Sequence, residues 1–245
     1  MNFYIGLHLP YLAQHFDRCF VSINVLRRRK SDFIVRDWIM DSGAFSELNL
    51  FGHYRNSVAQ YADEVNRWSK CGQMELAVTQ DYMCEPFMLE KTGLTVLEHQ
   101  QLTISRYDEL INLTDAPIMP VLQGYQPADY LAHVLMYGNR LRGNMRVGVG
   151  SVCKRNRNPN EIVRVLETIK VIRPDLRLHG FGLKTTALLN NYICSLLYSA
   201  DSMAWSYAAR REGRDGNSWL EADKFNNKIN NQMAIKNHQF VFSPE

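Results

Sequence analysis

Short apolar segments alternate with longer amphipathic ones along the whole chain, and this alternation limits the possible folds more than any other feature. The apolar segments have the length of β-strands and lie at residues 3–8, 20–25, 37–41, 75–81, 118–123, 146–150, 177–182 and 198–203. The intervening residues 57–70, 95–113, 127–137 and 159–172 carry apolar side chains at the helical spacings of three and four. Such alternation predicts a parallel sheet, because parallel strands are joined by helical crossovers.

The number of these units indicates a barrel. Eight strand–helix units in 245 residues match the size of a (β/α)8 or TIM barrel, which needs roughly 250 residues. We therefore predict an α/β fold in which residues 1–245 form a single barrel domain without a zinc subdomain. The residues after Trp219 are expected to form a C-terminal helical tail. A doubly wound open sheet has the same alternation and is the structural alternative.

Composition excludes several other classes of protein. A chain with 46% hydrophobic and 22% charged residues is not disordered, and none of its apolar runs approaches the roughly 20 residues that span a bilayer. Its five cysteines are an odd number without CxxC spacing, and its histidines lack HxH or HExxH spacing. These patterns argue against a disulfide scaffold and a metal site. We expect a cytoplasmic protein with no metal, no cofactor and no membrane contact.

Polar residues stand where several predicted strands end, which is where a barrel carries its chemistry. Asp41, Asp81 and Asp201 each follow apolar residues directly. Any one of them is as well explained as a helix cap, but three that converge on one rim favour a site. The other polar or small residues at these ends are Ser42, Gln123, Gly124, Gly148 and Gly150.

These residue types suit the breaking of a glycosidic bond at a purine. Two aspartates across a pocket can act as a carboxylate nucleophile and as a general acid or base. An aspartate beside a glutamine, as in Asp81 with Gln123, can read the hydrogen-bonding edge of a purine. Phe45 and Trp205 could stack on the base, although either side chain would serve equally well in the core.

The net charge of +3 says little about partners, but the placement of basic residues says more. Three clusters follow predicted strands, and we expect them on the rim that carries the aspartates. A basic rim is typical of a surface that binds a phosphate backbone, whereas any single basic run is usually a solvated loop. The expected nucleic-acid-binding residues are Arg27, Arg28, Arg29, Lys30, Lys154, Arg155, Arg157, Arg210, Arg211 and Arg214.

Taken in order, these segments resemble the tRNA-guanine transglycosylase superfamily over roughly residues 37–211. The run from Asp41 to Phe45 (DSGAF) is similar to the family's DSGGF segment. Asp81 matches its base-recognising aspartate, Gln123 with Gly124 its glutamine–glycine pair, and residues 148–150 its glycine segment. Residues 178–182 (LHGFG) resemble its LMGVG strand, with His179 where the family has the methionine under the base.

The resemblance implies a TIM-barrel pentosyltransferase that exchanges guanine in a nucleic acid for a 7-deazaguanine. By the same resemblance, Asp201 is the nucleophile and Asp41 the general acid or base. In the family two aspartates lie here, separated by two residues, and the later one is the nucleophile. In this chain the later position falls on Ala204, so either Asp201 has taken the role or the chemistry is lost. The short chain and the missing zinc signature look more like the compact, DpdA-like branch of bacteria and phages. That branch installs derivatives such as preQ0 in DNA, which in phages shields the DNA from restriction enzymes, and a phage member would act in the host cytoplasm.

Three rival functions stay open on the sequence. The same base exchange could act on tRNA. A non-catalytic subunit could have kept the barrel and the nucleic-acid binding, as the alanine at position 204 allows. A glycosidase or other small-molecule enzyme could use the Asp41–Asp201 pair with incidental basic loops. A homodimer is compatible with all of these.

Overall fold

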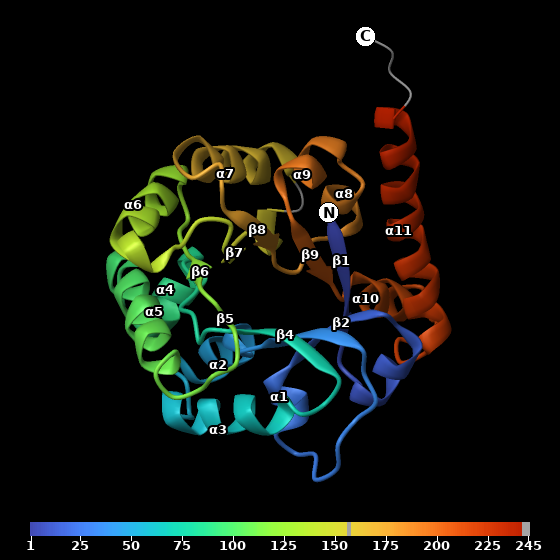
Figure 1. The fold of residues 1–245 in the computed structure, drawn as a ribbon, viewed down its shortest axis with the longest axis horizontal. Helices are drawn as coiled ribbons and strands as arrows, with labels where there is room; N and C mark the ends of the chain where they lie inside the picture. Colours follow the sequence, from blue (N-terminus) through green and yellow to red (C-terminus); the bar gives the residue numbers. More distant parts are fainter. Residues whose placement is uncertain (156–157, 242–245) are drawn as a thin grey trace.

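The computed structural model describes residues 1–155 and 158–241, and it forms a ring of parallel strands surrounded by helices (Figure 1). The strands are β1 (Asn2–Leu7), β2 (Arg18–Ser22), β3 (Asp37–Asp41), β4 (Gln73–Val78), β5 (Ile118–Met119), β6 (Val121–Leu122), β7 (Arg146–Val149), β8 (Arg177–Gly180) and β9 (Ser199–Ser202). Their order in the sheet is β5-β4-β3-β2-β1-β9-β8-β7-β6. The first and last members of this order are therefore consecutive in the sequence.

The ring closes through the single extended segment that contains β5 and β6. Only Pro120, which has no backbone N–H, separates the two short strands. β5 pairs with β4 on one side, and β6 pairs with β7 on the other. The Pro120 carbonyl itself accepts the Gly148 N–H at 2.8 Å. With β5 and β6 counted as one extended segment, the ring has eight strand positions. The prediction of a (β/α)8 barrel is therefore confirmed, and the alternative of an open sheet is excluded.

The helices follow the strands as the periodicity predicts. The expected helical segments appear as α3 (Val58–Trp68), α5 (Val96–Leu110), α6 (Pro127–Tyr137) and α7 (Pro159–Ile172). The N-termini of α3 and α5 are fixed by capping boxes, formed by Ser57 with Gln60 and by Thr95 with Glu98. The remaining helices are α1 (Ile23–Leu26), α2 (Ala44–Phe51), α4 (Pro86–Thr92), α8 (Thr185–Leu188), α9 (Asn191–Leu196), α10 (Ala204–Arg211) and α11 (Trp219–Val241), with 3-10 turns η1 (Pro10–His15), η2 (Gly138–Arg140) and η3 (Cys153–Arg155).

The helical tail completes the barrel on the side where the first crossovers are short. β1 and β2 are joined by the turn η1, and α1 is a single turn, so neither supplies a long covering helix. α11 lies along this side (Figure 1). Its Phe225 ring packs edge-on against Phe3 of β1, with ring centroids 6.0 Å apart, and Ala222 and Ile229 are fully buried. The part of the tail from Ala222 to Ile229 therefore packs into the core.

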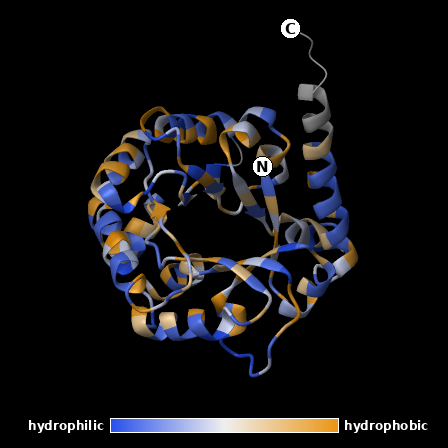
Figure 2. Cartoon of the chain, in the orientation of Figure 1, coloured by the Kyte–Doolittle hydropathy of each residue, from blue (hydrophilic) through white to orange (hydrophobic). Residues whose placement is uncertain are grey.

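Apolar side chains fill two layers. The outer layer lies between strands and helices, so the helices carry both orange and blue residues in Figure 2. The inner layer lies inside the ring and contains Tyr4, Phe20, Ile39, Val78, Met119 and Val121. Within β1 the side chains alternate between the layers: Phe3 and Ile5 point outward and Tyr4 points inward.

A polar cluster fills the barrel where the strands begin. The Tyr4 hydroxyl donates to Glu75 at 2.8 Å, and Arg146 pairs with Glu75 at 2.8 Å. Arg146 also donates to the Tyr4 hydroxyl at 3.1 Å. Burial, together with the Glu75 carboxylate, raises the pKa of Tyr4 far above its ordinary value, so the phenol stays neutral. This end of the ring is thus filled by a neutral phenol and an ion pair.

The buried stripe of α11 predicts that shortening Ile229 weakens the whole fold. Ile229→Ala is expected to lower the free energy of unfolding by about 2–4 kcal/mol, because it leaves a cavity in the core. Urea unfolding followed by circular dichroism measures this. The matched control Lys228→Ala, at an exposed position of the same helix, should change it by less than about 0.5 kcal/mol. Equal effects of the two changes would mean that α11 does not stabilise the barrel.

Candidate active site

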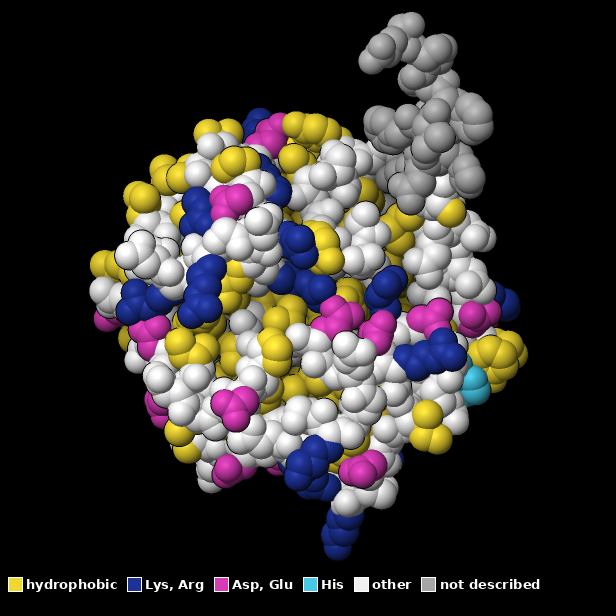
Figure 3. Space-filling view, viewed as in Figure 1, with side chains coloured by type: hydrophobic (Ala, Val, Ile, Leu, Met, Phe, Trp, Pro, Cys, Tyr) yellow, Lys and Arg dark blue, Asp and Glu magenta, His cyan; other side chains and the backbone are white. Residues whose placement is uncertain are grey.

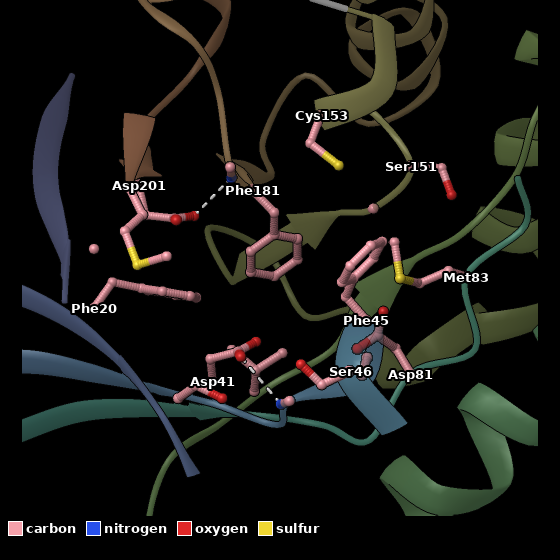
Figure 4. Close-up of a pocket in the computed structure, with 18 of the residues that line it drawn as sticks. Phe20, Asp41, Phe45, Ser46, Asp81, Met83, Ser151, Cys153, Phe181 and Asp201 are labelled. Carbon is pink, nitrogen blue, oxygen red and sulfur yellow. Dashed lines mark hydrogen bonds between the residues drawn. The ribbon is translucent and has the colours of Figure 1, made fainter. Parts of the chain in front are cut away.

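A pocket of about 280 Å³ opens at the C-terminal ends of the strands. Its walls come from most of the barrel: Gly6 on β1, Phe20 on β2, Asp41 on β3, Gln123 after β6 and Asp201 on β9 all line it. Figure 4 shows the carboxylates of Asp41, Asp81 and Asp201 around this one cavity. The three predicted aspartates therefore do converge, and they do so where a barrel places its chemistry.

Asp41 is held by the turn that ends β3. Its Oδ2 accepts the backbone N–H of Gly43 at 3.0 Å, and the Ser22 hydroxyl, next to it across the sheet, also donates to the carboxylate. Gly43 has a φ of +75°, and a Cβ at this residue would lie 2.3 Å from the Asn24 side chain. A side chain other than hydrogen therefore does not fit there, which explains the glycine in the Asp-Ser-Gly sequence.

Asp201 is held through one of its two carboxylate oxygens. The Gly182 N–H donates to Oδ1 at 3.0 Å, and the His179 Nε2 lies 3.3 Å from the same oxygen. The other ring nitrogen of His179 contacts the Ser199 hydroxyl at 2.8 Å. Within the part of the chain that the structure describes, no hydrogen bond engages Oδ2. That oxygen is the one available to react with a bound molecule.

Asp81 belongs to a separate, buried network. Its side chain accepts hydrogen bonds from the Gln123 amide and, at 3.3 Å, from the Ser42 hydroxyl. The Gln123 backbone is fixed in turn: its carbonyl accepts from Gln100 at 2.8 Å, and its N–H donates to His133 at 2.8 Å. Burial lowers the pKa of His133 to about 4, so the ring is neutral and can accept this hydrogen.

The pKa values of Asp41 and Asp81 are raised by desolvation and by neighbouring carboxylates. Burial raises the pKa of Asp41 to about 6, and the neighbouring Asp201 adds to the rise, against the hydrogen bonds from Ser22 and Gly43. Burial also raises the pKa of Asp81 to about 7, with a further rise from Asp41 and opposition from the Gln123 and Ser42 hydrogen bonds. Carboxyl groups with such values exchange protons near neutral pH, as a general acid or base must.

Aromatic rings form the other walls of the pocket. Phe20 and Phe181 have ring centroids 6.0 Å apart, and Phe45 stands at the rim with 43% of its surface exposed (Figure 4). Of these rings only Phe45 was among the predicted site residues. Phe20 lies two residues before Ser22 on β2, and both line the pocket, so the two-residue strand period could have found it. A cavity lined by aromatic rings and carboxylates suits a heterocyclic base.

A protein-family model now decides which of the related families the chain belongs to. The model described as DpdA, DeoxyPurine in DNA protein A, matches residues 1–220. The chain belongs to the DpdA family. A search of curated proteins returned no match. Membership of the DpdA family implies a role in deazapurine modification of DNA, with DNA as the substrate.

Several residues that the sequence suggested for base binding lie elsewhere. Trp205 is buried in the core, donates its Nε1 hydrogen to the Gly6 carbonyl at 2.8 Å and does not line the pocket. Gly124 packs against α6, where a Cβ would meet Asp129 and Tyr130. Gly148 makes room for the Phe181 ring, so it shapes the wall indirectly. Gly150, directly after β7, does line the pocket.

His179 and Ser42 act from behind the pocket wall. His179 is fully buried and stacks under Phe20, with ring centroids 5.6 Å apart at an angle of 15°. It touches Asp201, so it supports the carboxylate and does not lie under a base. Ser42 is likewise buried and contacts Asp81. Ala204 begins α10 and is also absent from the pocket wall, which leaves Asp201 as the acidic residue of this strand end.

The first basic cluster does not form part of the rim. Arg27 pairs with the buried Glu47 at 3.2 Å, and its side chain is only 16% exposed. Because α1 is one turn long, the chain then runs back along the barrel. The carbonyls of Arg29 and Lys30 accept hydrogen bonds from Arg67, near the end of α3 that leads into β4. The loop that contains Arg29 and Lys30 therefore lies toward the end of the barrel where the strands begin. This loop projects from the ring in Figure 1, and basic side chains lie over it in Figure 3. Their predicted place on the rim was wrong.

The other two clusters differ in how they are held. Arg155 is 9% exposed and donates to the Tyr125 and Ser151 carbonyls, so it fastens a loop of the rim. Arg157 lies outside the described residues, as does the side chain of Lys154. Arg214 pairs with Glu212 and Glu221. Arg210 and Arg211 remain as exposed basic side chains on α10, the helix that follows Asp201.

Two further features concern ligands and membranes. Over residues 1–155 and 158–241, no three His, Cys, Asp or Glu side chains form a group that could hold a metal ion. Across the same ranges, no helix is both long enough and apolar enough to span a membrane.

Because the pKa of Asp81 is raised, the ionised carboxylate is expected to lower the free energy of unfolding by an amount that grows with pH. The folded protein binds its proton more tightly than the unfolded chain, so the stability contributed by Asp81 is lost as pH rises toward 7. Asp81→Asn removes that cost. Its stabilising effect, measured by urea unfolding, should be larger at pH 8 than at pH 5 by on the order of 2 kcal/mol. Asp17→Asn, at an exposed residue, should show no such difference. Equal gains for Asp81→Asn at both pH values would contradict the raised pKa.

Proposed function

We propose that this DpdA-family chain exchanges guanine in DNA for a 7-deazaguanine derivative such as preQ0. The observation that carries the proposal is the convergence of three aspartates on one aromatic-walled pocket: Asp41 from β3, and the buried Asp201 from β9 and Asp81 after β4. Two of these carboxylates can work at a glycosidic bond while the third reads the base. Since a stacked base cannot enter such a pocket, the target nucleotide must turn out of the helix.

In the proposed reaction, Asp201 is the nucleophile. Its Oδ2 attacks C1′ of the nucleotide, the C1′–N9 bond breaks, and guanine leaves with a proton supplied by Asp41. A covalent aspartyl–sugar intermediate results. The Gly182 N–H and His179 hold Oδ1, so the carboxylate is already oriented when the sugar arrives.

The second half reverses the first with a different base. Asp41, now a carboxylate, takes the proton from N9–H of the incoming 7-deazaguanine, and N9 attacks C1′ and releases Asp201. Two displacements at one carbon retain the configuration. A pKa of about 6 allows Asp41 to act as acid in one step and base in the next.

Base recognition is assigned to Asp81 and Gln123. An ionised Asp81 accepts hydrogen bonds from the N1–H and N2–H groups of a guanine-type edge, and Gln123 donates to the oxygen at position 6. Guanine and its 7-deaza analogues share this edge, so one pocket serves the leaving and the entering base. Phe20, Phe45 and Phe181 supply the apolar surfaces for the ring faces.

The proposal predicts that Asp201 is indispensable for exchange. With guanine-containing DNA and labelled preQ0, the wild-type protein should incorporate label, and Asp201→Asn should reduce the rate on the order of 1000-fold or more. The Asn side chain matches the shape of Asp, and Asp17→Asn serves as the control for the substitution itself. Incorporation by Asp201→Asn at the wild-type rate would overturn the proposal.

Two further arms of this experiment separate the rival functions. Replacing DNA by tRNA tests whether the same exchange acts on RNA. Omitting preQ0 and denaturing the protein tests for a covalent protein–DNA adduct. A non-catalytic binding subunit would bind DNA without any adduct.

We also propose that Arg210 and Arg211 hold DNA phosphates beside the pocket. The double change Arg210→Ala with Arg211→Ala should weaken DNA binding and reduce the slope of log K against log[salt] by about 2. Fluorescence anisotropy over a salt series measures both. Arg36→Ala removes an exposed arginine at the start of β3, away from the pocket, and should leave the slope unchanged. The same loss in both variants would show that DNA does not lie on α10.

A further inference from the structure

Ser151 has an unusual backbone for its residue type. Its φ is +56°, a left-handed conformation that glycine adopts freely and that serine adopts at a steric cost. The residue is buried, follows Gly150 and lines the pocket. Strained residues persist at positions where their side chain is needed, so the question is what the Ser151 hydroxyl does.

The hydroxyl lies at the centre of a hydrogen-bond chain that ends at the base-reading residues. It accepts the Cys84 N–H at 3.1 Å, and it lies 2.9 Å from the Gln123 Oε1. Gln123 in turn donates its Nε2 hydrogen to Asp81. On its other side the hydroxyl lies 3.0 Å from the Glu85 Oε2, so an ionised Glu85 competes with Gln123 for the single hydroxyl hydrogen.

The position of the Gln123 side chain is fixed by packing, but its orientation is not. The side chain lies against Gly150, where a Cβ would come within 2.1 Å of Nε2. An amide of this shape fits equally well after a half-turn that exchanges its oxygen and nitrogen, so only hydrogen bonds can distinguish the two orientations. Two contacts favour the observed orientation: Asp81 accepts from Nε2, and Ser151 is placed to donate to Oε1.

We infer that Ser151 is a specificity-determining residue, which fixes the Gln123 amide so that the pocket accepts a base with an oxo group at position 6. With Oε1 held by Ser151, Nε2 stays beside Asp81, and the pocket presents a donor next to an acceptor. This pattern complements the O6 and N1–H of a guanine-type base. A 6-amino group would meet the amide N–H instead, donor against donor. The inference rests on the proposed function, because it assumes that a base occupies this pocket.

Removing the hydroxyl tests this role without endangering the fold. Ser151→Gly deletes the side chain and suits the positive φ, whereas Ser151→Ala deletes the hydroxyl and keeps the strain. Calorimetry with free guanine and with 2,6-diaminopurine, which differ at position 6 and in the hydrogen on N1, gives the ratio of their dissociation constants. Wild type should favour guanine, and both variants should lose about tenfold of this preference, while Ser151→Gly melts no lower than Ser151→Ala.

The controls separate this inference from the proposed function. Ser195→Ala, on an exposed part of α9, should keep the wild-type ratio. If the wild-type protein binds neither base and exchanges none in DNA, the proposed function fails. If it exchanges guanine with the expected preference and Ser151→Gly retains that preference in full, the function stands and the role of Ser151 is overturned.

Discussion

The closure of the ring through residues 117–123 is the constraint on which the site depends. One half of this segment pairs with β4 and the other half with β7, so the segment as a whole has a neighbour on each side and the C-terminal ends of the strands meet at one mouth. The segment ends at Gln123, which contacts Asp81 from the β4 side and Ser151 from the β7 side. The segment that closes the barrel thus also brings Asp81, Gln123 and Ser151 together. Buried contacts of Gln100 and His133 with the Gln123 backbone hold the end of this segment in place.

The sequence predicts those parts of the fold and the site that follow from local pattern. Apolar strands that end in aspartate, in parallel order, suffice to bring Asp41, Asp81 and Asp201 together, because parallel strands present the same ends to one edge. Trp205 shows the limit: its indole bonds the carbonyl of Gly6, a partner at the far end of the chain that no local pattern reveals. The basic loop after α1 shows a second limit of local pattern. The position of this loop depends on the length of α1, which is only one turn long.

The carboxylates that give the pocket its chemistry also oppose folding. Asp41 and Asp81 are removed from water and lie near other carboxylates, which is why their pKa values rise to about 6 and about 7. Hydrogen bonds from Ser22, Ser42 and Gln123 offset part of this cost. The remaining unfavourable free energy is offset by the burial of apolar side chains in the two layers of the core. The buried residues of α11 are part of this core. A barrel with fewer apolar contacts would hold the same carboxylates less well.

The covering of β1 by α11 has a consequence for the order in which the molecule can assemble on the ribosome. β1 is synthesised first, yet its partner β9 and its covering helix α11 are among the last elements made. Until they emerge, the first strand has an open edge and an apolar face exposed to the cell. The pairing of β1 with β9 and its covering by α11 are therefore late steps in assembly, which follow the synthesis of all the other strands.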